Sequence, residues 1–190
     1  WGRSSSLFDE KSEAIENRFN IDLGGIDYDA KFVFETIGYN LEGNEVGAAF
    51  GLVQLKNLEK NIQIRENNFK KQNDFFKNHN KLFLTPKQLE GSKTGWLAYP
   101  ILISEEAEFS RKEFQIYLEK RNIQTRVVFT GNVLRQPMMK NIKYKENKSG
   151  YLNSDAIMKR GVLLPLHHGM TDQMFARLHD TINEFIKNHC

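Results

Sequence analysis

The sequence predicts an α+β domain in which a small sheet carries helices on one face. Apolar residues recur at three- and four-residue steps through residues 57–79, which is the pattern of an amphipathic helix. The second half instead alternates short apolar runs with helical patterns. Hydrophobic residues make up 39% of the 190 residues and include 14 Phe, so the chain holds enough apolar material for a packed core.

The first 80 residues divide into a polar region and a helical region. Residues 1–30 are polar and irregular, and "KFVFETI" at 31–37 predicts a short strand or an extended lead-in. Helices are expected over about 44–55 and 57–79, either separate or continuous. One face of this helical region carries Leu55, Leu58, Ile62, Phe69 and Phe76.

Residues 81–150 predict two strands with a helix between them. "WLAYPILI" at 96–103 is the first strand, and its Pro100 predicts an edge position or a bulge. A helix follows over about 111–121, with a capping box at its start and an apolar stripe. "TRVVF" at 125–129 is the second strand. The capping box is Ser110 with Glu113, and the stripe is Phe114, Tyr117 and Leu118.

The remaining residues predict a short helix, a strand and a final helix. The short helix is expected over 153–161, with Ser154 as its cap and Gly161 as its stop. "VLLPL" is a third strand, and Thr171 caps the last helix. That helix buries a stripe of Met174, Phe175, Leu178, Ile182 and Phe185. We expect an active-site or interface loop region over 1–43, a helical link over 44–80 and a small α+β domain over 81–190.

Charge and composition exclude several classes of function. The net charge is only +3 and the basic residues are interleaved with acidic ones, so a nucleic-acid partner is not expected. No apolar run reaches the roughly 18 residues of a membrane span. The single cysteine, Cys190, allows no disulfide within one chain, which favours the cytoplasm. The chain begins "WGRSSS" without Met, so we expect its true start to lie upstream.

The segment "GYNLEGNEVGAAFGLVQL" at 38–55 joins a polar turn to a helix of small residues. Asn40 stands before the helix N-terminus, a place that suits a phosphate; alternatively it only stabilises its own turn. The helix carries Gly47 and Gly51, and each glycine costs about 1 kcal/mol relative to alanine. Close approach of another backbone would compensate, either within the chain or at a subunit interface.

The segment "TRVVFTGNVLRQP" at 125–137 is a second candidate site. Arg126, Asn132 and Arg135 surround a strand end, where guanidinium groups suit a carboxylate or a diphosphate. The alternative is a solvated loop with two surface charges.

Two further segments offer less. "LPLHHGMTD" places His167 and His168 before the last helix, where packing or capping is expected rather than metal binding. "WGRSSS" contains no nucleophile elbow, so a flexible loop is expected there.

Three of these segments together resemble the DegT/StrS family of pyridoxal-phosphate (PLP) sugar aminotransferases and dehydratases. They are "GYNLEGNEVGAAFGLVQL", "GVLLPLHHGMTDQMF" and "TRVVFTGNVLRQP", the last of which, with the opening "WGR", is similar to the RfbH-like branch. That branch contains 3-dehydrases acting on nucleotide-linked 4-keto-6-deoxy-hexoses in lipopolysaccharide sugar synthesis.

The resemblance implies the C-terminal portion of a fold-type I PLP enzyme that uses PLP or pyridoxamine phosphate. The PLP-linking Lys, or the His of dehydrases, would lie upstream, so this chain alone is expected to be inactive. The resemblance implies a homodimer in which Asn40 reaches the partner's PLP phosphate. It also implies a nucleotide-sugar site lined by Arg126, Asn132, Arg135, Trp1 and Arg3.

The chain departs from iron–sulfur members of that branch, which have cysteine ligands after "WGR". Ser4, Ser5 and Ser6 stand there, so no iron–sulfur cluster is expected. An aminotransferase and a cluster-free dehydratase both remain open. A non-catalytic α+β binding or dimerisation module is the alternative.

Overall fold

The computed structural model describes residues 21–29, 32–39, 41, 43–129 and 131–189. The chain divides into two units, Trp1–Lys56 and Asn57–Cys190. In the first unit, β1 (Ile21–Asp22) and β2 (Asp27–Tyr28) pair in an antiparallel hairpin. The helix α2 (Glu45–Lys56) follows them. Of the two alternatives for 31–37, the short strand does not form in the described part, where Phe34 makes an isolated bridge.

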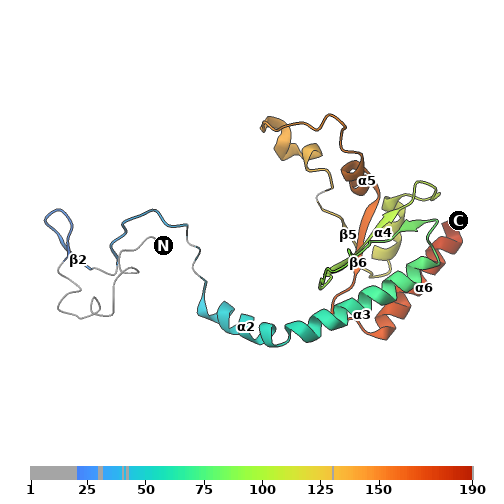
Figure 1. Cartoon of the computed structure of the whole chain (residues 1–190), viewed down its shortest axis with the longest axis horizontal. Helices are drawn as coiled ribbons and strands as arrows, with labels where there is room; N and C mark the ends of the chain where they lie inside the picture. The colour runs from blue at the N-terminus through green and yellow to red at the C-terminus, as the bar shows by residue number, and fades with distance from the viewer. Residues whose placement is uncertain (1–20, 30–31, 40, 42, 130, 190) are drawn as a thin grey trace. The chain divides into compact units, whose positions relative to one another are not determined.

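The second unit is an α+β domain, as predicted. It begins with the helix α3 (Leu58–Lys77). Its antiparallel sheet has the order β3-β4-β6-β5, so the last strand of the chain, β6, lies between β4 and β5. Figure 1 shows α3 and α6 side by side on the sheet. The remaining elements are β3 (Phe83–Leu84), β4 (Ala98–Ile103), α4 (Arg111–Glu119), β5 (Arg126–Val127), η4 (Val133–Arg135), η5 (Pro137–Asn141), α5 (Leu152–Arg160), β6 (Gly161–Pro165) and α6 (Asp172–His189).

One face of the sheet forms the core. Burial alternates along β4, so that Tyr99, Ile101 and Ile103 point into the core while their neighbours are half-buried. Phenylalanine rings from α3, β3, α4 and α6 fill the space against this face. They are Phe76, Phe83, Phe114 and Phe185, all with at most 1% of their surface exposed. The other face keeps half-buried Pro100, Leu102 and Leu163.

Pro100 lies in an inner strand, not in an edge strand. The short β3 pairs only with Leu102 and Ile103 of β4, so on that side of β4 no strand pairs with Pro100. A missing N–H is tolerated there because the strand is locally an edge. The prediction was therefore right about the local environment and wrong about the strand.

The helix ends follow the predicted chemistry in some places and not in others. The capping box of Ser110 and Glu113 is confirmed, and the Thr171 hydroxyl accepts a hydrogen bond from Met174 N at 3.3 Å. The helix α4 ends at Glu119 rather than 121, because Asn122 adopts φ 58° and the N–H of Ile123 reaches back to Leu118 O. This is a Schellman ending.

Other sequence predictions need correction. The helix α5 begins after Tyr151 rather than at a Ser154 cap. Leu55 and Leu58 are exposed, since the helical region is interrupted at Asn57 between α2 and α3. Met174 is 51% exposed because it borders a surface hollow described below.

Candidate functional site

The predicted site residues fall into two groups. Arg126 lies in β5, Asn132 is the residue before η4, and Arg135 ends η4. Trp1, Arg3 and Asn40 lie outside the described residues, as do Ser4, Ser5, Ser6 and Cys190. Of the predicted site residues that the structure describes, Arg126 is the one that borders the hollow described next.

Arg126 borders a hollow of about 350 Å³ at one end of the sheet. It pairs opposite Leu163, which itself pairs opposite Pro100, so Arg126 lies on the sheet face turned away from the core. Ala98 and His167 line the same hollow. Among the described residues, the guanidinium of Arg126 has no hydrogen-bond or ion-pair partner. An exposed guanidinium beside apolar walls suits a carboxylate or a phosphate.

His167 connects this hollow to a second one. The second hollow measures about 230 Å³ and is bordered by Met170, Met174 and Arg177 of the turn and helix that follow β6. His167 lines both hollows, together with Gln124 and Pro165. The two hollows thus form one surface region around the segment between β6 and α6.

The helix α3 fixes this segment through buried amides. Asn68 Nδ2 donates to His167 O at 3.0 Å, and Gln72 Nε2 donates to Pro165 O at 3.3 Å. Both side chains are buried, and their four-residue spacing places them on one face of α3. Arg65 contacts His168 Nδ1 at 3.3 Å one turn earlier. The segment "LPLHHGMTD" is thereby held in one place relative to Arg126.

Sequence reasoning missed this row of amides, although a signal was present. Asn68 and Gln72 lie beside Phe69 and Phe76 on the face of α3 that meets the core. A buried amide needs hydrogen-bond partners, so polar residues within an apolar stripe indicate a specific contact.

Gln72 also holds the ring of His179 in α6. His179 Nε2 lies 2.9 Å from Gln72 Oε1, and the ring stacks on Phe75 with centroids 3.9 Å apart. Because Oε1 only accepts, we assign the proton to Nε2. Burial lowers the pKa of His179 to about 4. The charge of Asp180 acts in the opposite direction and raises the pKa, while His79 lowers it by a smaller amount. The ring is therefore neutral at pH 7.

His167 and His168 follow β6 rather than lying in a strand. His167 Nδ1 accepts from Gly169 N at 3.2 Å, which stabilises the turn before α6. Within the described part of the chain, no group of three His, Cys, Asp or Glu side chains is placed to hold a metal ion.

Asn132 and Arg135 converge on one carboxylate. Asn132 Nδ2 donates to Asp155 Oδ1 at 2.8 Å, while Arg135 Nε and Nη2 donate to the two carboxylate oxygens at 2.5 and 2.6 Å. The hydrogen bonds from Arg135 and then from Asn132 lower the pKa of Asp155 to about 2. These contacts fasten η4 to α5, and they occupy much of the donor fork of Arg135.

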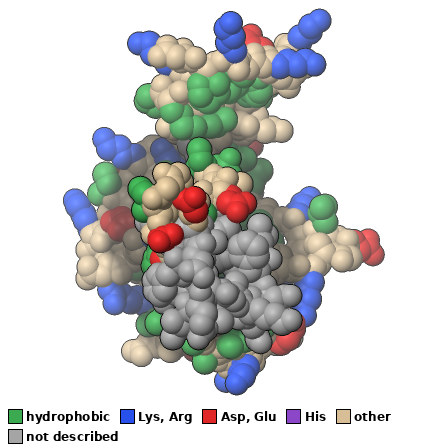
Figure 2. All heavy atoms as spheres, turned by 90° about the vertical axis from the view of Figure 1, so that its left-hand side faces the viewer, with side chains coloured by type: hydrophobic (Ala, Val, Ile, Leu, Met, Phe, Trp, Pro, Cys, Tyr) green, Lys and Arg blue, Asp and Glu red, His purple; other side chains and the backbone are tan. Residues whose placement is uncertain are grey.

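The turn before η4 requires glycine. Gly131 has φ +66°, and a Cβ there would lie 2.5 Å from Cβ of Met158. The segment after this turn, at the top of Figure 2, presents hydrophobic side chains beside several Lys and Arg. Its exposed residues include Met138, Ile142, Tyr144 and Lys148.

The helix α2 exposes apolar side chains within its own unit. None of its residues is buried, and Val46, Phe50 and Val53 are among those exposed. Around Gly51, no described atom beyond its chain neighbours and the backbone of its own helix lies within 4 Å of the position that a Cβ would take. Asn44 Oδ1 accepts from Gly47 N at 2.7 Å and so caps the helix.

Comparison with known sequences identifies relatives along nearly the whole chain. The pattern of the DegT/DnrJ/EryC1/StrS aminotransferase family matches residues 8–183. The lipopolysaccharide biosynthesis protein RfbH of Salmonella typhimurium is 29% identical over 187 residues, covering 97% of this chain and 43% of that protein. The dTDP-4-dehydro-2,6-dideoxy-D-glucose 3-dehydratase of Saccharopolyspora spinosa is 31% identical over 188 residues, covering 98% of this chain and 40% of that protein.

Solved structures show the same fold. The E. coli GDP-4-keto-6-deoxy-D-mannose-3-dehydratase with bound hydrated PLP has a TM-score of 0.69 and 26% identity, over 79% of this chain and 38% of that one. The chain therefore spans about two fifths of the relatives that it matches, and its fold is that of a portion of a PLP enzyme. In the part of the chain that the structure describes, no helix is both long and apolar enough to cross a membrane.

Proposed function

This chain belongs to the DegT/DnrJ/EryC1/StrS aminotransferase family, and on that premise we propose that it forms part of a PLP-dependent enzyme acting on a nucleotide-linked keto-deoxy sugar. The reaction is a 3-dehydration or an amino transfer in lipopolysaccharide sugar biosynthesis. The observation that carries the proposal is the match of 97–98% of the chain to RfbH and to a sugar-nucleotide 3-dehydratase. The similarity to the 3-dehydratase of Saccharopolyspora spinosa favours the dehydration.

The described residues fit the anionic substrate of such an enzyme. Arg126 offers a guanidinium without a partner among the described residues, at the mouth of a hollow with apolar walls. We assign Arg126 to the phosphate groups of the nucleotide sugar. His167 borders the same hollow and is held there through its backbone by Asn68.

Asn132 and Arg135 do not line the hollow of Arg126, and we propose for them a supporting role in the substrate site. Their contacts with Asp155 hold the segment that follows β5, and Arg135 Nη1 remains for a substrate group. Trp1 and Arg3 complete the proposed substrate site by resemblance to the family.

The cofactor is PLP or pyridoxamine phosphate, which supplies an electron sink when bound. This chain contributes Asn40, whose side-chain amide donates to the cofactor phosphate of the partner subunit. We assign the Lys or His that distinguishes an aminotransferase from a dehydratase to the part of the relatives that this chain does not cover. With Ser4, Ser5 and Ser6 after "WGR", the reaction proceeds without an iron–sulfur cluster.

The helix α2 supports the proposed homodimer. Its apolar side chains are exposed within its unit, and Gly51 has free space for a second backbone. The single cysteine is compatible with the reducing cytoplasm, where we place the reaction.

Steady-state kinetics of the intact protein with PLP test the proposal. Arg126→Gln is expected to raise KM for the nucleotide sugar by about tenfold or more, because it removes a charged hydrogen bond to the phosphates. Lys148→Gln, which removes an exposed charge elsewhere, serves as the matched control. An intact protein that binds no PLP and turns over no nucleotide sugar would refute the proposal.

A further inference from the structure

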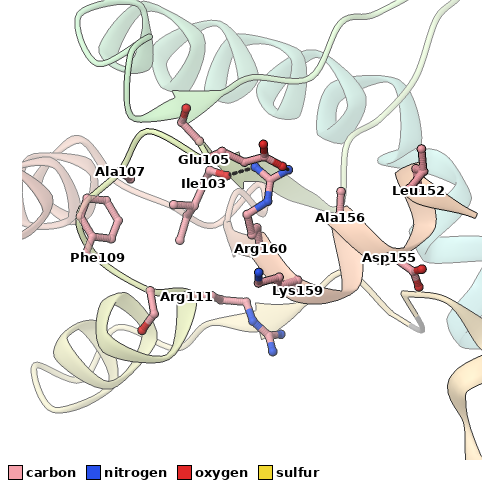
Figure 3. Close-up of a pocket in the computed structure, with 12 residues that line it drawn as sticks. Ile103, Glu105, Ala107, Phe109, Arg111, Leu152, Asp155, Ala156, Lys159 and Arg160 are labelled. Atoms are coloured by element: carbon pink, nitrogen blue, oxygen red, sulfur yellow. Dashed lines mark hydrogen bonds and ion pairs between the residues drawn. The ribbon is translucent and has the colours of Figure 1, made fainter.

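A third hollow lies at the other end of the sheet. It measures about 520 Å³ and is bordered by the turn after β4, the start of α4 and the end of α5 (Figure 3). It shares no lining residue with the hollow of Arg126. The two begin at opposite ends of β4, which at about 3.3 Å per residue are roughly 17 Å apart. We call this hollow the α4–α5 pocket.

Cations outnumber carboxylates in the lining of the α4–α5 pocket, by three to two. Lys159 and Arg160 end α5, and Arg111 begins α4. In Figure 3, Lys159 lies between Arg160 and Arg111. Neither Arg111 nor Lys159 has a hydrogen-bond or ion-pair partner among the described residues. Like charges gathered in one pocket repel one another, so a bound anion would relieve the repulsion.

Arg160 forms the fixed part of the pocket. Its side chain is only 17% exposed, and it donates to Ile103 O at 2.5 Å and to Glu105 at 2.9 Å. These bonds use two of the five N–H donors of a guanidinium. Three donors therefore make no hydrogen bond to a described residue.

The acidic residues of the pocket are already engaged. Glu105 is 83% exposed and pairs with Arg160. Asp155 is occupied by Asn132 and Arg135. Glu113 caps the start of α4, so the helix end is not the source of the attraction. The uncompensated charges are those of Arg111 and Lys159.

The remaining lining suits an organic group. Ala107, Phe109 and Leu152 supply apolar surface, and Ser104 has a hydroxyl proton available to donate, since its oxygen accepts from Glu106 N at 3.3 Å. The volume falls within the usual range of small-molecule sites. It exceeds what a single inorganic phosphate fills.

We propose that the α4–α5 pocket is a second anion site, which binds the phosphate group of a small phosphorylated metabolite through Arg111, Lys159 and Arg160. The pocket shares no lining residue with the hollow of Arg126, and it is linked to the proposed substrate site through Asp155, which Asn132 and Arg135 hold. Binding of a phosphate there does not depend on the reaction proposed for the substrate site. Arg160 holds the pocket together, while Arg111 and Lys159 supply the charge that recognises the ligand.

Calorimetric titration of the intact, PLP-loaded protein with inorganic phosphate and with a hexose 1-phosphate tests this site. Lys159→Gln and Arg111→Gln are each expected to weaken binding at least about fivefold, as for loss of a charged hydrogen bond. Lys148→Gln and Arg126→Gln should leave the same binding event unchanged. Because Lys159 is exposed and makes no described bond, its variant keeps the fold.

The two probes distinguish the sources of the phosphate. Tighter binding of the hexose phosphate supports contacts between the sugar and the apolar walls, while equal affinity supports recognition of the phosphate alone. Three results overturn the proposal: neither probe binds, Lys159→Gln and Arg111→Gln bind as the unmodified protein does, or Lys148→Gln loses as much affinity as they do.

Discussion

The helices α2 and α3 follow one another in the chain, yet they use their apolar residues in opposite ways. The helix α3 presents Phe69 and Phe76, with the amides of Asn68 and Gln72, to a core within its own unit. The helix α2 buries none of its residues in its described unit. A helix with apolar residues can bury them either against its own chain or against another chain. In the proposed homodimer, α2 belongs to the second case.

The largest effect is expected in the core that α3 covers. Phe76 is 0% exposed and packs on Phe83 and Tyr99, so Phe76→Ala should cost about 3–5 kcal/mol of unfolding free energy. Denaturant unfolding measures it. Phe50→Ala in α2, where the ring is 66% exposed, is the matched control and should leave the unfolding of residues 57–190 unchanged. Equal losses in both variants would erase the distinction between the helices.

The reverse experiment places a charge on each helix. Phe50→Asp should raise the dimer dissociation constant about 100-fold, since an unpaired charge in an interface is costly. Lys60→Asp on the exposed side of α3 should not change it. Sedimentation equilibrium of the intact protein gives both values. If Phe50→Asp dimerises as tightly as the unmodified protein, α2 is not the interface.

A smaller effect is expected from the buried amides of α3. Gln72→Ala removes the bonds to Pro165 O and to His179, which should cost about 1–3 kcal/mol because the partners stay buried. The exposed Gln63 on the same helix is the control, and Gln63→Ala should cost less than about 0.5 kcal/mol. Thermal and urea unfolding of the two variants measure both losses of unfolding free energy. Equal costs would show that Gln72 does not anchor the segment after β6.

The smallest effect is a dependence of stability on pH. The folded pKa of His179 is about 4, below its usual 6.5, so between these values the unfolded chain binds the extra proton. Stability is retained above pH 6.5 and falls as the pH drops toward 4. Allowing for partial exposure of the ring, the loss is about 1–2 kcal/mol. His179→Gln should reduce the change of unfolding free energy with pH over this range, measured by urea unfolding at several pH values. If the pH dependence is unchanged in the variant, other groups cause it.

Local chemistry made much of the fold predictable. The capping box of Ser110 and Glu113 and the cap at Thr171 need only neighbours three residues away, and the sequence shows such neighbours directly. The buried stripe of α6 was predicted except for Met174, whose exposure depends on the shape of a distant surface. Pro100 shows the same limit, because only the length of β3 makes its position a local edge.

The site was predicted less completely for a similar physical reason. Arg126 and Arg135 lie nine residues apart, yet one has no described partner and the other is held by Asp155, twenty residues further along the chain. No spacing rule indicates which arginine is free. The contacts of Asn68 and Gln72 with residues beyond 160 depend equally on tertiary packing, as does the grouping of Arg111 with Lys159.

The most direct test of the central claim is the PLP affinity of the intact protein with a substitution at Asn40. Asn40→Ala is expected to weaken PLP binding at least about tenfold while the protein remains dimeric, because a hydrogen bond to the cofactor phosphate is lost. Asn44→Ala removes the cap of α2 four residues later and is the matched control, expected to retain PLP. If Asn40→Ala binds PLP with the affinity of the unmodified protein, Asn40 does not bind the cofactor phosphate.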